Sequence, residues 1–185
     1  QQPEFKGELL EELAAATHDV YSKSVANYYS SLSAADMSYD DLPEDLKEQN
    51  RENVRHILPK VDAIGYAVVA ARSDDPLFGF SDEQIERLAE IEHDRWMLQK
   101  LENGWRWGEV KDDDQKINEH MLPWQDLTEA EMVERYGAHA DRIGTAALPE
   151  DVKKWDLDLV RAIPDILAKV GYTLVKLEDA TEDPE

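Results

Sequence analysis

Two histidine–aromatic pairs are the residues best suited to hold a flat ligand. His18 and Tyr21 are three positions apart, and so are His93 and Trp96. Residues three apart share a face of a helix, so each pair would present an imidazole beside an aromatic ring. If the two pairs face each other, their rings could sandwich a base, with each stacking contact worth about 1–3 kcal/mol. The imidazoles could then hydrogen-bond ring nitrogens or a phosphate.

Basic side chains in the same parts of the chain are candidate phosphate partners. A guanidinium group matches phosphate oxygens with two parallel hydrogen bonds, whereas an ammonium group supplies a compact charge. The candidates are Arg51, Arg55, Arg95, Lys111 and Lys116. Together with the two histidine–aromatic pairs and the loop residues Trp105 and Trp107, they make up the predicted ligand-binding set.

A structural interpretation of these residues stays open beside the ligand-binding one. Tyr21 and Trp96 would then belong to the core, and the two histidines would satisfy buried carbonyl groups. The loop tryptophans and Trp124 would pin a long loop to the helices, and Trp155 would be core or interdomain contact.

No catalytic or metal-binding pattern accompanies the set. The five histidines show no HExxH spacing, and cysteine is absent. The run Lys111 to Asp114 lacks the Gly at the sixth position and the Glu at the twelfth that a calcium loop requires. The nucleophile elbow and the two common glycine-rich phosphate loops are also missing. We therefore predict a non-enzymatic protein with no catalytic residue, no metal and no cofactor.

Charge excludes further classes. The 185 residues carry a formal net charge of −22 and are 42% hydrophobic. Such a chain can build a core, yet it repels nucleic-acid phosphates and anionic lipid, so neither a nucleic-acid polymer nor a membrane is an expected partner. A chain without cysteine suits a reducing compartment, and we expect a cytoplasmic location. Because the chain begins at Gln1 without Met, we expect it to be part of a longer polypeptide.

The segments that position these residues occur twice. Residues 13–19 reappear at 88–94, an offset of 75, and Gly65-Tyr66 reappears as Gly171-Tyr172, an offset of 106. The predicted organisation is a first repeat at 8–72, a linker at 73–80, a second repeat at 81–177 and a frayed acidic tail at 178–185.

Each repeat is predicted to contain two main helices and a short strand. In the second repeat, Ser81 is a helix N-cap and Asn103-Gly104 a helix end. A second helix spans about 149–170 with Pro164 inside it, and Pro59 lies at nearly the same place in the first repeat, so both helices should kink. The β-prone runs 67–69 and 173–175 are expected to form short paired strands. The fold class is mainly α, with two repeats related by a pseudo-two-fold axis.

The second repeat carries a specific set of motifs. They are His93-Asp94-Arg95-Trp96, Gly104-Trp105-Arg106-Trp107-Gly108, Val110-Lys111-Asp112-Asp113, Lys116, His120-Met121-Leu122-Pro123-Trp124 and the segment 149–172. With these motifs, residues 8 to 177 resemble a tandem pair of ryanodine receptor repeats of the bacterial type. Trp107 replaces the usual Tyr and Lys111 the usual Arg, and one residue is missing between His120 and Pro123. The first repeat lacks the Gly-Trp segment altogether.

The resemblance implies a ligand site between the two repeats, with an adenine nucleotide or an NAD-derived or cyclic nucleotide signal as ligand. It also implies a fused or associated effector domain, since bacterial pairs often follow another domain. We therefore expect a sensor of a nucleotide-like small molecule. The alternative is a protein-interaction or structural scaffold module without a small-molecule ligand, which could self-assemble as a homo-oligomer.

Overall fold

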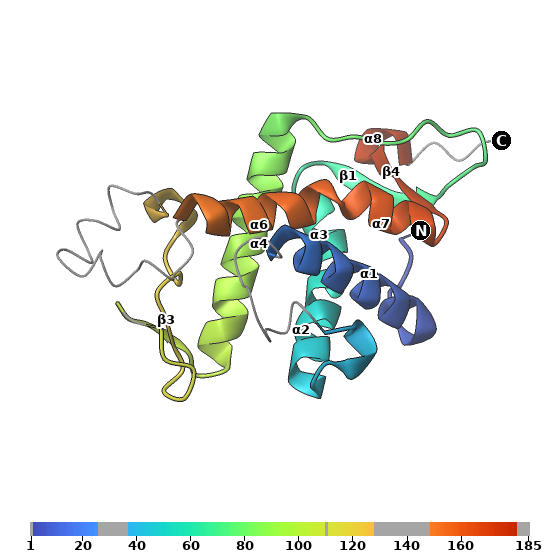
Figure 1. Cartoon of the computed structure of the whole chain (residues 1–185). Coiled ribbons are helices and arrows are strands. Elements are labelled where there is room, and N and C mark those ends of the chain that lie inside the picture. The colour runs from blue at the N-terminus through green and yellow to red at the C-terminus, as the bar shows by residue number, and fades with distance from the viewer. Residues whose placement is uncertain (1, 26–36, 110, 128–148, 181–185) are drawn as a thin grey trace. The chain divides into compact units, whose positions relative to one another are not determined.

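The computed structural model describes residues 2–25, 37–109, 111–127 and 149–180. These residues are mainly helical, with two short two-stranded sheets (Figure 1). The helices are α1 (Gly7–Val25), α2 (Glu44–Arg55), α3 (Ile57–Asp62), α4 (Asp82–Glu102), α6 (Pro149–Arg161), α7 (Ile163–Lys169) and α8 (Leu177–Ala180), with 3₁₀ helices η2 (Tyr39–Asp41) and η3 (Trp124–Asp126). The strands are β1 (Tyr66–Ala70), β2 (Arg106–Trp107), β3 (Ile117–Asn118) and β4 (Tyr172–Lys176). None of the described helices has the length and apolarity needed to cross a membrane.

The chain divides into two compact units. The first contains Gln1–Leu88 and Asp158–Glu185, and the second contains Ala89–Leu157. This division differs from the predicted repeat boundaries, because the end of the second repeat pairs with the first repeat through β4 and β1. The core of the first unit is built from buried aliphatic residues of both segments: Leu13, Val54, Ile57, Val61, Val68, Ile163, Leu167 and Leu174.

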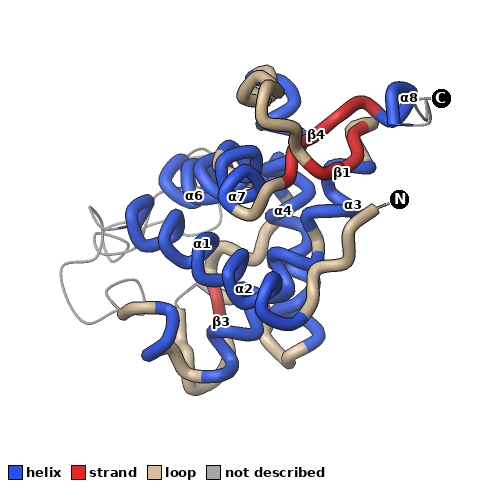
Figure 2. Tube along the Cα trace, turned by 90° about the vertical axis from the view of Figure 1, so that its right-hand side faces the viewer, coloured by secondary structure: helices blue, strands red, loops and turns tan. Residues whose placement is uncertain are grey.

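Strands β1 and β4 form an antiparallel ribbon, which Figure 2 shows as two red segments side by side. Val68 lies opposite Leu174 at its centre, and these two positions are 106 residues apart. Gly65 and Gly171, at the same offset, precede the strands with φ angles of 85° and 84°, a region that favours glycine. The predicted short paired strands after each Gly-Tyr are confirmed.

Three edge-to-face aromatic contacts involve the tyrosines of this ribbon, and in the shortest of them Phe78 meets Tyr66 with a centroid separation of 5.3 Å and an interplanar angle of 72°. Phe5 meets Tyr172 with a centroid separation of 6.2 Å and an interplanar angle of 68°. Phe80 meets Tyr66 with a separation of 6.1 Å and an angle of 85°. Phe5 and Phe80 are 75 positions apart and the two tyrosines 106 positions apart, which are the two offsets of the sequence repeat.

Both predicted helix kinks are present as complete breaks. The first helix stops at Arg55 and restarts at Ile57, and the second stops at Arg161 and restarts at Ile163. Pro59 and Pro164 lie just after the breaks, and a proline has no N–H to donate to the carbonyl four residues earlier. The helix therefore loses a hydrogen bond at each of these points.

Helix α4 has the predicted ends. Ser81 Oγ accepts a hydrogen bond from the Gln84 N–H at 3.2 Å, and Gln84 Oε1 accepts one from the Ser81 N–H at 3.0 Å, a reciprocal capping box. At the other end Gly104 has a φ of 84°, and the Trp105 N–H donates to the Lys100 carbonyl at 2.9 Å. This geometry is the glycine-dependent Schellman termination.

The predicted acidic tail begins differently in the structure. Leu177–Ala180 form the short helix α8, and the Leu177 N–H donates to the Gly65 carbonyl at 3.0 Å. This hydrogen bond continues the contact between β1 and β4 beyond the strands, so residues 178–180 are not a frayed tail. Residues 181–185 lie outside the described part of the chain.

Candidate functional site

His93 is a buried residue of the second unit, and only 1% of its surface is exposed. Its Nε2 lies 2.5 Å from the Leu122 carbonyl oxygen, and its Nδ1 lies 3.3 Å from a carboxylate oxygen of Asp156. The imidazole thus connects α4, the segment before η3, and α6. Burial has the largest single effect and would lower its pKa, but the hydrogen bond and charge of Asp156, together with the Leu122 carbonyl and the charge of Asp94, outweigh burial and raise the pKa of His93 above its usual value.

Two tryptophan rings surround this imidazole. The Trp96 centroid is 5.6 Å from that of His93, and the Trp124 centroid is 6.1 Å away. The Lys153 ammonium lies 4.8 Å from the Trp124 centroid, within reach of a cation–π contact. The i,i+3 spacing of His93 and Trp96 therefore places the rings together as predicted. His93 and Trp124 are buried, whereas Trp96 is half-buried.

The loop after α4 is held in place by contacts within the second unit. Trp107 Nε1 donates to the Glu119 carbonyl at 3.2 Å, and the Lys100 ammonium lies 4.1 Å from the Trp105 ring centroid. Strand β2 pairs in parallel with β3, and a Cβ on Gly108 would lie 2.4 Å from Ile117 Cγ2. A residue with a side chain would fit at that position only if Ile117 moved. These contacts agree with the structural interpretation of the loop tryptophans.

Three predicted phosphate partners in the second unit already contact protein groups. Arg95 donates to the buried Glu92 carboxylate at 2.7–3.1 Å. Lys116 Nζ donates to the Asn103 carbonyl at 2.8 Å, which satisfies an acceptor at the end of α4. Lys111 Nζ lies 3.8 Å from Asp113 in an exposed pair. Of the three, Lys111 is held least tightly.

Comparison with known families addresses this part of the chain. Residues 79–146 match the family model described as RyR domain. This stretch is therefore similar to an RyR domain. It contains α4, β2, β3 and η3, and so includes His93, Trp96, Arg95 and the loop tryptophans. Its last part, from residue 128, lies outside the described residues.

His18, which precedes the RyR match, makes a contact parallel to that of His93. It is buried, and its Nε2 lies 2.7 Å from the Met37 carbonyl oxygen, with Ser22 Oγ at 3.3 Å. Met37 stands two residues before the aromatic residue that begins η2, as Leu122 stands two residues before the one that begins η3. The Tyr21 ring is 6.5 Å from that of His18. Both histidines thus satisfy backbone carbonyl groups, as the structural interpretation predicts.

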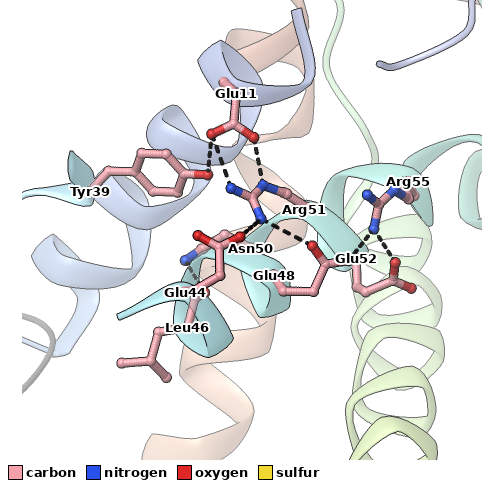
Figure 3. A network of polar contacts seen from close by, with 9 residues as sticks. All are labelled: Glu11, Tyr39, Glu44, Leu46, Glu48, Asn50, Arg51, Glu52 and Arg55. Atoms are coloured by element: carbon pink, nitrogen blue, oxygen red, sulfur yellow. Dashed lines mark hydrogen bonds and ion pairs between the residues drawn. The ribbon is translucent and has the colours of Figure 1, made fainter. Parts of the chain in front are cut away.

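Arg51, also outside the RyR match, is the hub of an ionic network that joins α1 and α2 (Figure 3). Its Nε lies 2.5 Å from Glu11 Oε1, and its Nη1 lies 2.5 Å from Glu44 and 3.1 Å from Glu48. The Tyr39 hydroxyl donates to the second oxygen of Glu11 at 2.9 Å. The network therefore ties α1, η2 and α2 together through one guanidinium group.

Arg55 extends this network along α2. It contacts Glu48 at 2.5 Å and also contacts Glu52. The hydrogen bond from Arg51 lowers the pKa of Glu11, and that from Arg55 lowers the pKa of Glu48. Burial, followed by the hydrogen bond to Glu11, raises the pKa of Tyr39 to about 12.

A shallow hollow of about 720 Å³ lies beside the network. The two arginines line it together with four carboxylate residues, namely Glu8, Glu11, Glu12 and Glu48. The predicted phosphate partners Arg51 and Arg55 are therefore together at one surface, but carboxylates already contact both guanidinium groups. A phosphate group that binds there would compete with these carboxylates.

Several partners were not identified by the sequence analysis. Asp156 holds His93, and Glu11 with Tyr39 holds Arg51; these contacts join residues 28 to 63 positions apart, which have no periodic signal. Glu48 and Glu44, in contrast, stand three and seven positions before Arg51 on α2. That spacing places them on the same helix face as Arg51, so these two partners were readable from the sequence.

Proposed function

We propose that this chain is a non-enzymatic ligand-sensing module made of two RyR-type repeats, in which a nucleotide-like small molecule binds between the repeats and shifts their arrangement. The RyR match over residues 79–146 supports the second repeat. The ligand class comes from the resemblance of the motifs. The observation that carries the paired architecture is the register of β1 and β4.

That register is centred on Val68 and Leu174, which occupy equivalent positions of the two predicted repeats. An antiparallel pair centred on equivalent residues has a local two-fold axis at its centre. Two of the aromatic contacts follow the same relation, because Phe5, just before the first repeat, meets Tyr172 of the second, and Phe80, just before the second repeat, meets Tyr66 of the first. Such reciprocity is the hallmark of a two-fold interface.

Two repeats related in this way provide a simple sensing mechanism. A ligand that contacts both repeats favours the arrangement to which it binds more tightly, by no more than the difference in affinity. A fused or associated effector domain would then read the arrangement. Because an anionic ligand approaches a chain of net charge −22, added salt should tighten or speed its binding by screening the repulsion.

Calorimetric titration of the intact 185-residue chain with ATP, ADP, ADP-ribose and cyclic AMP tests the proposal. We expect at least one of them to bind with a dissociation constant below millimolar and near one ligand per chain. Trp96→Phe should retain most of the affinity and Trp96→Ala should lose it, whereas Arg161→Gln, which changes an exposed residue, serves as the control. The absence of binding by all four would contradict the proposed function.

One observation favours the alternative, a protein-interaction module. Carboxylates already hold Arg51, Arg55 and Arg95, so these arginines do not present free positive charge to an anionic ligand. An acidic helical module of this kind suits a basic protein partner. The test is native mass spectrometry of the chain isolated from its host, recorded before and after treatment with nuclease and removal of nucleotides. The added mass distinguishes a retained small molecule from a retained basic protein.

A further inference from the structure

A second hollow in the first unit combines residues of both predicted repeats. It has a volume of about 470 Å³ and lies between α1, η2 and α7. It does not include His18, Tyr21 or either arginine of the Arg51 network. We refer to it as the α1–α7 groove.

The floor of the α1–α7 groove is apolar and formed by small or branched side chains. Leu13 and Ala16 contribute from α1, and Ile166 and Val170 contribute from α7. Leu13 and Ile166 are buried, whereas Ala16 and Val170 are half-buried. Because Leu13 and Ile166 are almost fully covered by the chain itself, an aliphatic side chain in the groove would contact mainly Ala16 and Val170.

The rim of the groove is acidic. Glu12, Asp19 and Asp40 are exposed residues that line it, and Lys169 is the one basic residue in the lining. Within the described ranges, no hydrogen bond or ion pair engages these three carboxylates. They differ in this from Glu11, Glu44 and Glu48, which hold Arg51. The rim therefore has a surplus of negative charge that the described part of the chain leaves uncompensated.

We propose that the α1–α7 groove docks a basic amphipathic segment of a protein partner, which places an aliphatic side chain on the floor and Lys or Arg side chains beside the three rim carboxylates. Charge complementarity selects this occupant. A second copy of the chain also has a net charge of −22, so the acidic rim would repel it. Long basic side chains also suit such a groove, because their methylene stems can lie on the floor while their charged ends reach the rim. The inference is independent of nucleotide sensing.

The test uses fluorescence anisotropy of the intact chain with a labelled helical peptide made of Leu and Lys, whose leucines form one face. A peptide of the same composition in scrambled order, without an apolar face, is the first control. The rim variant is Glu12→Gln/Asp19→Asn/Asp40→Asn. A matched variant, Asp62→Asn/Glu86→Gln/Glu102→Gln, removes the same charge from exposed residues outside the groove lining.

We expect the rim variant to weaken peptide binding about tenfold and the matched variant to change it less than about twofold. The scrambled peptide should bind more weakly than the amphipathic one. If the rim variant and the matched variant weaken binding equally, only the overall electrostatic field of the chain attracts the peptide, and the proposal is overturned. It is also overturned if spermidine alone binds with the same dependence on the rim residues, because the occupant is then a small polycation.

Fold retention is checked separately. The rim and matched variants both change exposed side chains, so their circular dichroism and thermal midpoints should agree with the unmodified chain. A third variant, Ala16→Leu, partly fills the floor without changing charge. It should weaken the amphipathic peptide more than the scrambled one; an equal effect on both contradicts a role for the apolar floor.

Discussion

His93 and Asp156 form a buried pair in which the imidazole Nδ1 lies 3.3 Å from a carboxylate oxygen. The protonated imidazole can donate to Asp156 and to the Leu122 carbonyl at the same time, whereas the neutral ring has one N–H for the two acceptors. The pair therefore connects the protonation of one side chain to the packing of α4, α6 and the segment before η3.

The first prediction concerns pH. Because the pKa of His93 is raised in the folded state, its stabilising contribution is complete below the unfolded pKa of about 6.5 and is lost as pH rises through the folded pKa. Urea unfolding followed by tryptophan fluorescence should show a falling free energy of unfolding as the pH increases above about 6.5. Asp156→Asn should reduce this dependence, and an imidazole NMR titration should show a lower His93 pKa. An unchanged NMR pKa would show that Asp156 does not hold the proton.

The second prediction concerns Arg51. Arg51→Gln leaves Glu11, Glu44 and Glu48 without their shared cation, while their exposure lets water screen part of the repulsion. We expect a loss of about 1–2 kcal/mol in the free energy of unfolding, measured by urea titration. Arg51→Lys should recover only part of it, because an ammonium lacks the planar fork. Arg161→Gln, at an exposed pair, should change stability by less than about 0.5 kcal/mol, and an equal loss there would argue against a special role of the network.

The third prediction concerns Tyr39. Its raised pKa of about 12 means that the phenol stays protonated above its usual range near 10. The stabilising contribution of the neutral phenol is complete below about 10 and is lost as the pH rises through about 12. Absorbance at the tyrosinate band should therefore lose a late-titrating component in Tyr39→Phe. If Tyr39→Phe instead removes a component that titrates near pH 10, the buried hydrogen bond from Tyr39 to Glu11 is contradicted.

The fourth prediction concerns Gly108. A Cβ at this position would lie 2.4 Å from Ile117 Cγ2, so Gly108→Ala should destabilise the pairing of β2 and β3 by about 1–3 kcal/mol. Gly79→Ala is the control, since nothing lies within 4 Å of a Cβ there. Thermal unfolding measures both. Adding Ile117→Ala should recover part of the loss in the double variant, and purely additive losses would show that the two side chains do not clash.

Local features were readable from the sequence. Ser81, Gly104 and Pro164 set the start of α4, its end and the break between α6 and α7, because caps and prolines act through hydrogen bonds within a few residues. The strands after Gly65 and Gly171 were readable because β-prone residues follow each glycine, although their pairing joins positions 106 residues apart. The match of residues 79–146 to the RyR domain agrees with the motifs that begin at His93.

The state of the candidate ligand residues was decided only by the tertiary structure. Sequence spacing puts His93 beside Trp96 on one helix face, but it does not show that Leu122 and Asp156 occupy both ring nitrogens. It identifies Arg51 as a cation, but not that Glu11, 40 positions away, holds the guanidinium. A short motif determines which groups a helix presents, because its geometry is local. The partners of those groups depend on which distant segments the hydrophobic core brings together. A single motif does not predict which segments these are.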